Sequence, residues 1–149
     1  MRIYLAFLAA ILAVCATGSA DNTASVSATS LETIELDMDD INTWALAIGD
    51  NTKNANFNAR ANVNFDVYAR EDLGDGKMVN GVKPMSNALV IHTDRTVTLT
   101  GSDQQIAGVI NLGDWSGIGY FMEYKQLLTY NDPAGSYSLT ITYTGQAHV

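Results

Sequence analysis

Residues 55–67 have the sequence ANFNARANVNFDV, in which apolar and polar side chains alternate without interruption. Apolar residues occupy every odd-numbered position from Ala55 to Val67, and polar residues occupy the even-numbered positions. This period of two predicts a β-strand with one buried face, because an α-helix would distribute the same side chains around its whole circumference. The run is longer than the usual strand of about five or six residues. We therefore expect it either to bend and serve two sheets or to belong to an extended assembly.

The remaining sequence contains shorter alternating runs separated by turn residues. Two strands are expected ahead of the long run, the first at Ile34, Leu36 and Met38 and the second at Trp44, Leu46 and Ile48. Turn residues at 49–51 end the second strand, and those at 74–76 and 80–81 predict a loop or a short hairpin around residues 77–79. Further strands are expected at residues 88–91, 97–99, 106–112, 120–130 and 137–144.

This arrangement of strands predicts the fold class. About eight short strands, with turn chemistry between them and no long stretch of helical periodicity, are typical of an all-β chain folded as an antiparallel β-sandwich. We expect an Ig-like or jelly-roll-like sandwich, and a sheet closed into a barrel is the structural alternative.

Residues 1–20 have the features of a secretory signal peptide. Arg2 precedes an almost wholly apolar stretch at residues 3–14, and small residues at 18–20 offer a peptidase cleavage site. A membrane anchor is the alternative, but this stretch is shorter than the roughly 20 residues that span a bilayer. Cleavage after residue 20 predicts a mature chain of residues 21–149, a single β-sandwich domain that is secreted to the extracellular space or the cell surface.

Cys15 is the chain's only cysteine, and it lies within the predicted signal peptide. The sequence Leu12-Ala13-Val14-Cys15 is similar to a lipobox, so a lipoprotein is a third interpretation. Removal of the signal peptide would leave residues 21–149 without cysteine, and therefore without an internal disulfide or a thiolate metal site. We expect packing and sheet pairing alone to stabilise the mature domain.

The charge balance is acidic. The chain has 8 Lys and Arg residues against 16 Asp and Glu, a formal charge of −8 that becomes −9 when Arg2 is removed. This negative charge opposes binding to nucleic acid and to anionic lipid headgroups. We therefore expect no nucleic-acid partner, and no membrane span in the mature chain.

The sequence predicts no catalytic site. His92 and Asp94 lie close together near a strand end, but no serine occupies a Gly-x-Ser-x-Gly elbow and the mature chain has no cysteine nucleophile. His148 lies at the end of the chain, where we expect it to be mobile. We interpret His92 as a surface or strand-end residue, assign no catalytic residue and do not expect an enzyme.

Acidic residues offer a secondary hypothesis of calcium binding. Asp37, Asp39 and Asp40 could supply oxygen ligands, and Asp72 and Asp75 form a weaker group. Neither group follows the twelve-residue calcium loop with its closing glutamate. We therefore assign no metal ligand and no cofactor.

Aromatic residues could bind a surface glycan. The four candidates fall close together in the sequence: Trp115, Tyr120, Tyr124 and Tyr130. Tyr120 and Tyr124 share the parity of one strand face, which favours a core role for both. Trp115 lies in a glycine-rich stretch and is the better candidate for an exposed platform.

The polar face of the long run is rich in asparagine. Amides occur at Asn54, Asn56, Asn58, Asn62 and Asn64. Each amide both donates and accepts hydrogen bonds, and stacked asparagine ladders join strands in extended β-assemblies. The alternative is a solvent-exposed face with an asparagine bias.

The chain also resembles a class of secreted, cysteine-poor β-sandwich domains from cell surfaces, especially those of methanogenic archaea. The resemblance is carried by Trp44-Ala45-Leu46 with Gly49-Asp50-Asn51-Thr52, and by Tyr124-Lys125-Gln126 with Asp132, Gly135 and residues 137–144. The first segment is similar to the Trp-x-Leu of bacterial wall-associated WxL domains, whereas the last strand has Thr142-Tyr143-Thr144-Gly145 in place of their Thr-Trp-x-Leu. The resemblance implies a surface or matrix location and a structural role, with no active site to transfer.

Together these features predict a non-enzymatic structural subunit of an extracellular layer, sheath or fibre. We expect it to form homo-oligomers or polymers through β-strand or polar-face contacts, including donation of residues 21–30 to a neighbouring copy as an added strand. The alternative is a secreted adhesion module that binds a carbohydrate or calcium.

Overall fold

The computed structural model describes residues 27–81, 83–110 and 120–149. The chain divides into two units, Met1–Ser30 and Leu31–Val149. In the first unit, residues 27–30 are exposed and belong to no strand. The predicted signal peptide, Cys15 and Trp115 all lie outside the described residues.

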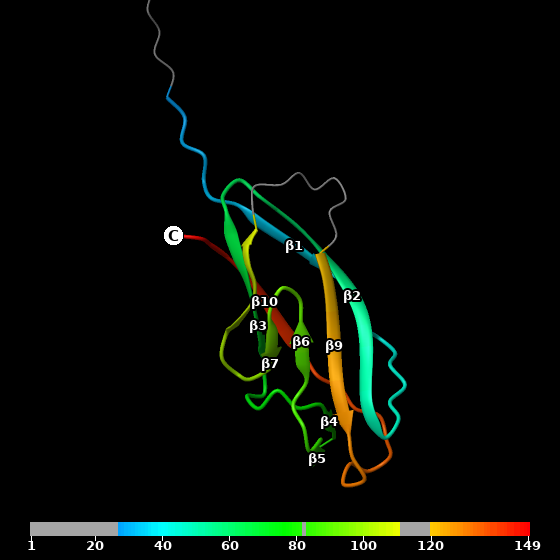
Figure 1. Ribbon diagram of the computed structural model, residues 1–149. Helices are drawn as coiled ribbons and strands as arrows, with labels where there is room; N and C mark the ends of the chain where they lie inside the picture. The colour runs from blue at the N-terminus through cyan, green and yellow to red at the C-terminus, as the bar shows by residue number, and fades with distance from the viewer. Residues whose placement is uncertain (1–26, 82, 111–119) are drawn as a thin grey trace, which may run out of the picture. The chain divides into compact units, whose positions relative to one another are not determined.

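The second unit is all-β, and its described part contains antiparallel strands in three sheets (Figure 1). The largest sheet has the order β1-β2-β9-β6-β7, the second has the order β10-β3-β8, and β4 pairs with β5 in a small hairpin. The strands are β1 (Ile34–Met38), β2 (Gly49–Ala61), β3 (Phe65–Glu71), β4 (Val79–Asn80), β5 (Lys83–Pro84), β6 (Val90–His92), β7 (Thr96–Thr98), β8 (Gln104–Ile110), β9 (Tyr120–Leu128) and β10 (Ile141–Ala147).

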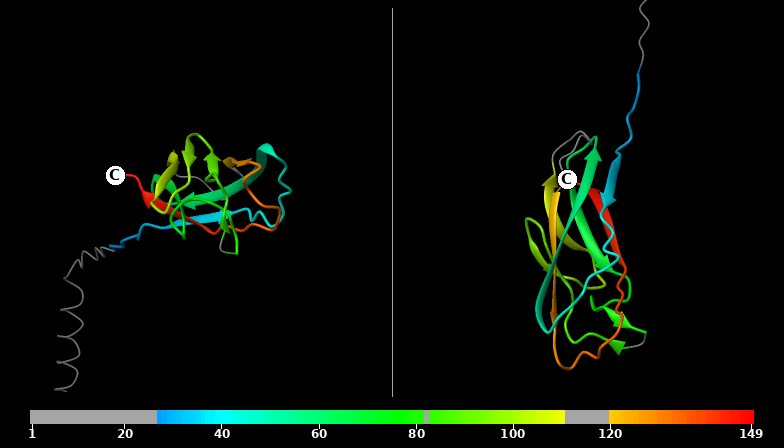
Figure 2. Two further views of the ribbon diagram at one scale, coloured as in Figure 1. Left: turned by 90° about the horizontal axis from the view of Figure 1, so that it is seen from below. Right: turned by 90° about the vertical axis from the view of Figure 1, so that its right-hand side faces the viewer.

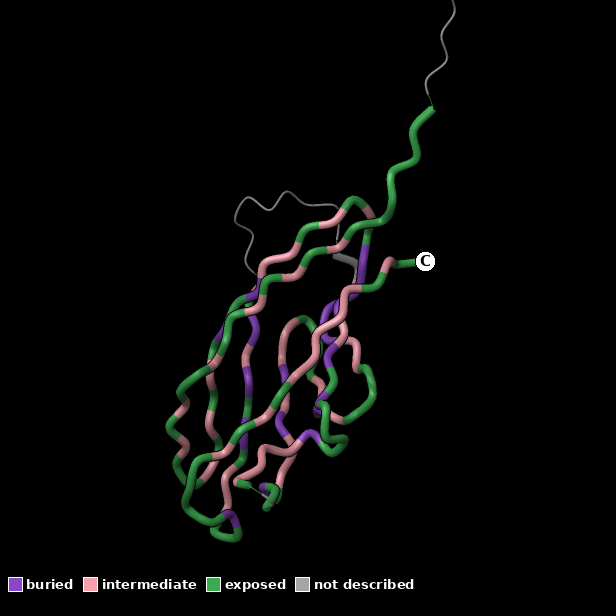
Figure 3. Tube along the Cα trace, turned by 180° about the vertical axis from the view of Figure 1, so that it is seen from behind, coloured by how far each residue is buried: buried purple, intermediate pink, exposed green. Residues whose placement is uncertain are grey.

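The five-stranded and three-stranded sheets form the two layers of a β-sandwich (Figure 2). Buried side chains alternate with more exposed ones along the strands (Figure 3). Phe57 and Met122 of the larger sheet belong to the same buried cluster as Phe65, Val67 and Ile106 of the smaller one. The predicted all-β antiparallel sandwich is confirmed.

The long alternating run forms two strands in different sheets. β2 ends at Ala61 and β3 begins at Phe65, so residues 62–64 carry the chain from the larger sheet to the smaller one. The alternation survives the bend because both strands turn their odd-numbered side chains toward the same core, where Phe57 and Phe65 are buried. Of the two expectations for this run, the bend that serves two sheets is therefore correct.

Asn62 accounts for the bend through its side-chain amide. Its Oδ1 accepts a hydrogen bond from the Thr33 amide at 2.8 Å, and its Nδ2 donates to the Leu31 carbonyl at 2.6 Å. These bonds tie the turn to the chain that enters β1. The five asparagines consequently do not form one face, because Asn54, Asn56 and Asn58 lie in β2 whereas Asn62 and Asn64 lie in the turn.

Two further strand predictions are wrong in detail. Residues 44–48 do not form a strand, and β2 already begins at Gly49, inside the predicted turn. The last strand begins at Ile141 and runs to Ala147, instead of covering residues 137–144. Its predicted first half, residues 137–140, is joined to other described residues by an isolated bridge between Ser138 and Val79 and by the hydrogen bond from the Asp72 amide to the Thr140 carbonyl. Both differences concern the same side of the sandwich.

Candidate functional site

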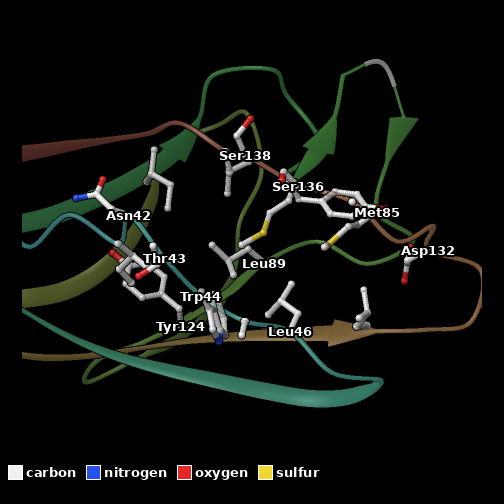
Figure 4. Close-up of a pocket in the computed structure, with 18 of the residues that line it drawn as sticks. Asn42, Thr43, Trp44, Leu46, Met85, Leu89, Tyr124, Asp132, Ser136 and Ser138 are labelled. Carbon is white, nitrogen blue, oxygen red and sulfur yellow. The ribbon is translucent and has the colours of Figure 1, made fainter.

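A groove with a volume of about 950 Å³ opens on that side of the sandwich. Its walls are the segment between β1 and β2 and the segment that leads into β10. Trp44, Leu46, Met85 and Leu89 extend into this space, opposite the segment that carries Ser138 (Figure 4). The groove therefore combines apolar side chains with a polar rim that includes Asp40, Asn42 and Ser136.

Residues 40–46, which we call the strap, form one wall of the groove. Within the described structure, the main chain of the strap makes no hydrogen bond. The strap is anchored at both ends: the Asp39 amide donates to the Asn56 carbonyl at 3.1 Å, and the Asn51 side chain bonds both main-chain groups of Ala47 at 2.8 Å. Between these anchors, side-chain packing alone holds it.

Trp44 and Leu46 explain why the strap was predicted to be a strand. Their alternation with exposed Ala45 and Ala47 is real, since Trp44 and Leu46 are half-buried. However, alternation reports only that every second side chain faces an apolar surface. Here that surface is the groove, and the segment packs against it without joining a sheet.

β10 forms the opposite wall and presents an unpaired edge. The even-numbered residues bond toward β3, because the Asp72 amide donates to the Thr140 carbonyl at 3.3 Å and the His148 amide donates to the Asn64 carbonyl at 2.8 Å. In an antiparallel strand the intervening residues point their main-chain groups to the other side. The groups of Ile141 and Tyr143 therefore face away from β3, and no strand of the described structure pairs with them.

β1 lies beside the other half of β10 without pairing to it. The two strands run side by side (Figure 2, right), but no backbone hydrogen bond joins them within the described residues. Gly145 permits this approach, because a Cβ atom there would lie 2.5 Å from Cγ2 of Ile34. Ile34 thus packs against this edge at Gly145, and farther along it Leu139, Ile141 and Tyr143 line the groove.

A pair of tyrosines joins the two layers at the groove. The hydroxyl oxygens of Tyr124 in β9 and Tyr143 in β10 are 2.6 Å apart, within hydrogen-bonding distance. Burial raises the pKa of both phenols. Both side chains are therefore neutral at physiological pH, and each hydroxyl can donate to or accept from the other.

Asp132 lines the groove, and both oxygens of its carboxylate accept hydrogen bonds. Its Oδ1 accepts from the Ser86 amide and hydroxyl at 2.6 and 2.8 Å, and its Oδ2 accepts from the Thr129 amide and hydroxyl, both at 2.8 Å. Burial alone would raise the pKa of Asp132, but these hydrogen bonds lower it to about 2. The carboxylate is ionised and fastens two loops together.

The two histidines lie outside the residues that line the groove. His92 Nδ1 is 2.8 Å from the Thr96 hydroxyl across the β6–β7 hairpin. His148 was expected at a mobile end, but its Nδ1 lies 2.9 Å from the Asp66 carboxylate and its amide bonds to Asn64. Asp66 occupies one of the even-numbered, polar positions of the long run. It is nevertheless buried, with a relative exposure of 7%.

Three of the five candidate calcium ligands accept hydrogen bonds from the protein. Asp39 Oδ2 accepts from the Asn56 amide at 2.9 Å, and Asp72 Oδ1 accepts from the Thr142 hydroxyl at 2.8 Å. Asp75 Oδ1 accepts from the Lys77 amide at 3.0 Å. Within the described ranges, no group of three or more His, Cys, Asp or Glu side chains could hold a metal ion.

Of the four aromatic residues proposed as a sugar platform, the structure describes the three tyrosines, and Trp115 lies outside the described residues. Tyr120 stacks on Phe57, with ring centroids 4.9 Å apart, and Tyr124 is buried, as the shared parity of these tyrosines predicted. Tyr130 is 91% exposed. The aromatic residue that sequence reasoning overlooked is Trp44, which was assigned to a strand and instead lines the groove.

Compared with protein-family models, curated proteins and solved structures, the chain matches none of them. The described residues contain no helix that is long and apolar enough to cross a membrane. We therefore infer a function from the groove, the strap and the free edge of β10.

Proposed function

We propose that this chain is a structural subunit of an extracellular layer, sheath or fibre, and that copies of it assemble through strand-edge contacts. The observation that carries the proposal is the edge of β10, which no described strand pairs with and which lies beside a groove containing exposed apolar side chains. The predicted secretion signal and the absence of cysteine from residues 21–149 support the extracellular location.

An open strand edge promotes association unless the sequence protects it. Protected edges usually carry lysine, proline or a bulge, or they are covered by another segment. β10 has the sequence ITYTGQA, with no charged residue and no proline. Among the described residues, Ile34 of β1 packs against it at Gly145, and we infer that the stretch toward Leu139 pairs with another chain.

The groove adds an apolar contact to this edge. Backbone pairing supplies general affinity in strand addition, and pockets for alternate side chains supply specificity. Leu139, Ile141 and Tyr143 line the groove along the edge, and Trp44 and Leu46 face it from the strap. An added strand could bond to the edge and bury every second side chain against these residues.

Electron microscopy of the purified secreted protein, with light scattering over a range of concentrations, tests the proposal. We expect regular polymers or large oligomers whose mass increases with protein concentration. A protein that stays monomeric at every concentration, with and without calcium, would rule out the structural-subunit function.

Two substitutions at neighbouring positions locate the contact. Leu139→Lys places a charge on the groove side of the edge, whereas Thr140→Lys places one on the exposed opposite side. We expect Leu139→Lys to prevent assembly and Thr140→Lys to leave it intact. Thermal unfolding of both variants shows whether each still folds.

The second candidate function is an adhesion module that binds a surface glycan in the same groove. Trp44 favours it, because indole faces stack on sugars and this one lines the same groove as the polar Asn42, Ser136 and Ser138. Titration with oligosaccharides, followed by tryptophan fluorescence, tests this alternative. A saturable change that Trp44→Ala abolishes would support it.

A further inference from the structure

We propose that the groove accepts residues 21–30 of a second copy of this chain, as an added strand on the free edge of β10. This inference rests on the proposed function, since it names the segment that joins one subunit to the next. Three features support it: the sequence of the segment, the point where the chain enters the sandwich, and the length of the β10 edge beside the groove.

The sequence of residues 21–30, DNTASVSATS, suits an added strand. Ala24, Val26 and Ala28 alternate with threonine and serine, so a strand here would have one small apolar face and one hydroxyl face. The segment contains no proline and no glycine, and Asp21 is its only charged side chain. It therefore brings little negative charge to a groove that Asp39, Asp40 and Asp132 already line.

Small side chains suit a groove that is already partly filled. The strap places Trp44 and Leu46 in the space opposite β10, and the cavity that remains measures about 950 Å³. Alanine and valine could pack against these side chains without displacing the strap.

The segment is long enough for the open edge. A strand rises about 3.3 Å per residue, so residues 21–30 would span about 33 Å and the seven residues of β10 span about 23 Å. Because Ile34 packs at Gly145, we place the added strand along residues 139–143, where three side chains line the groove. Residues 21–30 can cover that stretch with several residues to spare as a linker.

The entry point of the chain favours a neighbouring groove over its own. The Leu31 carbonyl is held by Asn62, next to the pairing of Ile34 with Ala61 at one end of β2. The groove reaches Ile48 and Leu128, beside the pairing of Gly49 with Leu128 at the other end of β2. To fill its own groove, the chain would have to reverse direction at Leu31 and pass β1.

This separation of donor and acceptor also predicts the form of the assembly. A contact between two different surfaces is head-to-tail, and it gives an open filament unless the rotation between subunits closes a ring. With about 43 Å between the ends of β2, each subunit would take a strand at one end and give one at the other. We therefore expect linear fibres.

The first test is a pair of substitutions within the segment of the full chain. Val26→Lys places a charge on the face that enters the groove, and Ser27→Lys places one on the opposite face. We expect Val26→Lys to remain monomeric at concentrations where the parent polymerises, and Ser27→Lys to polymerise like the parent. If Val26→Lys assembles normally while Leu139→Lys does not, the groove is an interface but its occupant is another segment.

The second test is direct binding, and it gives an answer even if the parent is a monomer. The receiver is the full-length Val26→Lys protein, whose own segment should leave the groove empty, and the probe is a fluorescent peptide of residues 21–30. We expect saturable binding that becomes at least tenfold weaker when Leu139→Lys is added, and that Thr140→Lys leaves unchanged. Absence of binding, or binding insensitive to Leu139→Lys, would overturn this inference and leave the evidence on assembly untouched.

Discussion

The hydroxyl groups of Tyr124 in β9 and Tyr143 in β10 lie 2.6 Å apart and join the two layers of the sandwich at the groove. On this side no backbone hydrogen bond links β1 to β10 in the described structure. The tyrosine pair therefore connects the two layers where their neighbouring strands do not pair.

Removing one tyrosine hydroxyl should weaken the domain. Tyr143→Phe leaves the Tyr124 hydroxyl buried without its partner, which costs about 1–3 kcal/mol. The double variant Tyr124→Phe, Tyr143→Phe should lose less than the sum of the single variants, because neither hydroxyl is then left unpaired. Urea unfolding of all four proteins measures this coupling, and strictly additive effects would show that the hydrogen bond contributes nothing.

The Asp132 carboxylate predicts a loss of stability in acid. Its pKa is lowered from 3.8 to about 2, so the folded state favours the ionised form. The resulting stabilisation is fully present above the unfolded pKa and is lost as the pH falls from about 4 toward 2. Asp132→Asn should be less stable than the parent at neutral pH and should lose less stability across that window.

Denaturant unfolding at several pH values between neutrality and 2 checks the role of Asp132. Asp50→Asn is the control, since Asp50 is exposed on β2. A profile for Asp132→Asn as steep as that of the parent would assign the acid loss to other carboxylates.

Gly76 should tolerate no side chain. Its φ is +70°, and a Cβ atom would clash with the Leu99 carbonyl and press on Ala88. We expect Gly76→Ala to lose several kcal/mol, well beyond the roughly 1–2 kcal/mol of the left-handed conformation alone. Gly81→Ala is the matched control, because Gly81 has φ +62° and open space around it. Thermal unfolding compares the two, and equal losses would contradict the predicted clash.

The two faces of the long run should respond differently to substitution. Phe57→Asp or Phe65→Asp should unfold the domain, since a buried unpaired charge costs several kcal/mol against a total stability of about 5–15 kcal/mol. Asn58→Ala should fold normally. Asn62→Ala should loosen the start of β1, because its amide bonds Thr33 and Leu31. Circular dichroism and amide exchange distinguish these outcomes, and a folded Phe→Asp variant would refute the assignment of the buried face.

The core could be predicted from the sequence, and the site could not. Alternation identifies the buried face of residues 55–67 because side-chain direction in a strand is a local property. It does not reveal where a strand ends, and here the pattern continues across the bend at residues 62–64 since both strands face one core. For the same reason, alternation did not reveal that the five asparagines would be divided between β2 and the turn.

The groove depends on relations that a local pattern does not contain. Trp44 and Leu46 alternate as in a strand, yet no described residue forms a hydrogen bond with the main chain of the strap. Tyr143 meets Tyr124 only because β10 and β9 lie in opposite layers. Asp132 gains its partners from Ser86, which is distant in sequence. Pairing partners and contacts between layers are set by the topology.

Amide hydrogen exchange on β10 tests most directly the claim that its free edge joins copies of this chain. In monomeric Leu139→Lys protein, the amides of Ile141 and Tyr143 should exchange rapidly, whereas those of Thr142 and Thr144 should be protected by pairing with β3. In the assembled parent, Ile141 and Tyr143 should become protected by at least tenfold. If these two amides exchange equally fast in the assembled parent and in the monomer, the edge of β10 is not the site of assembly.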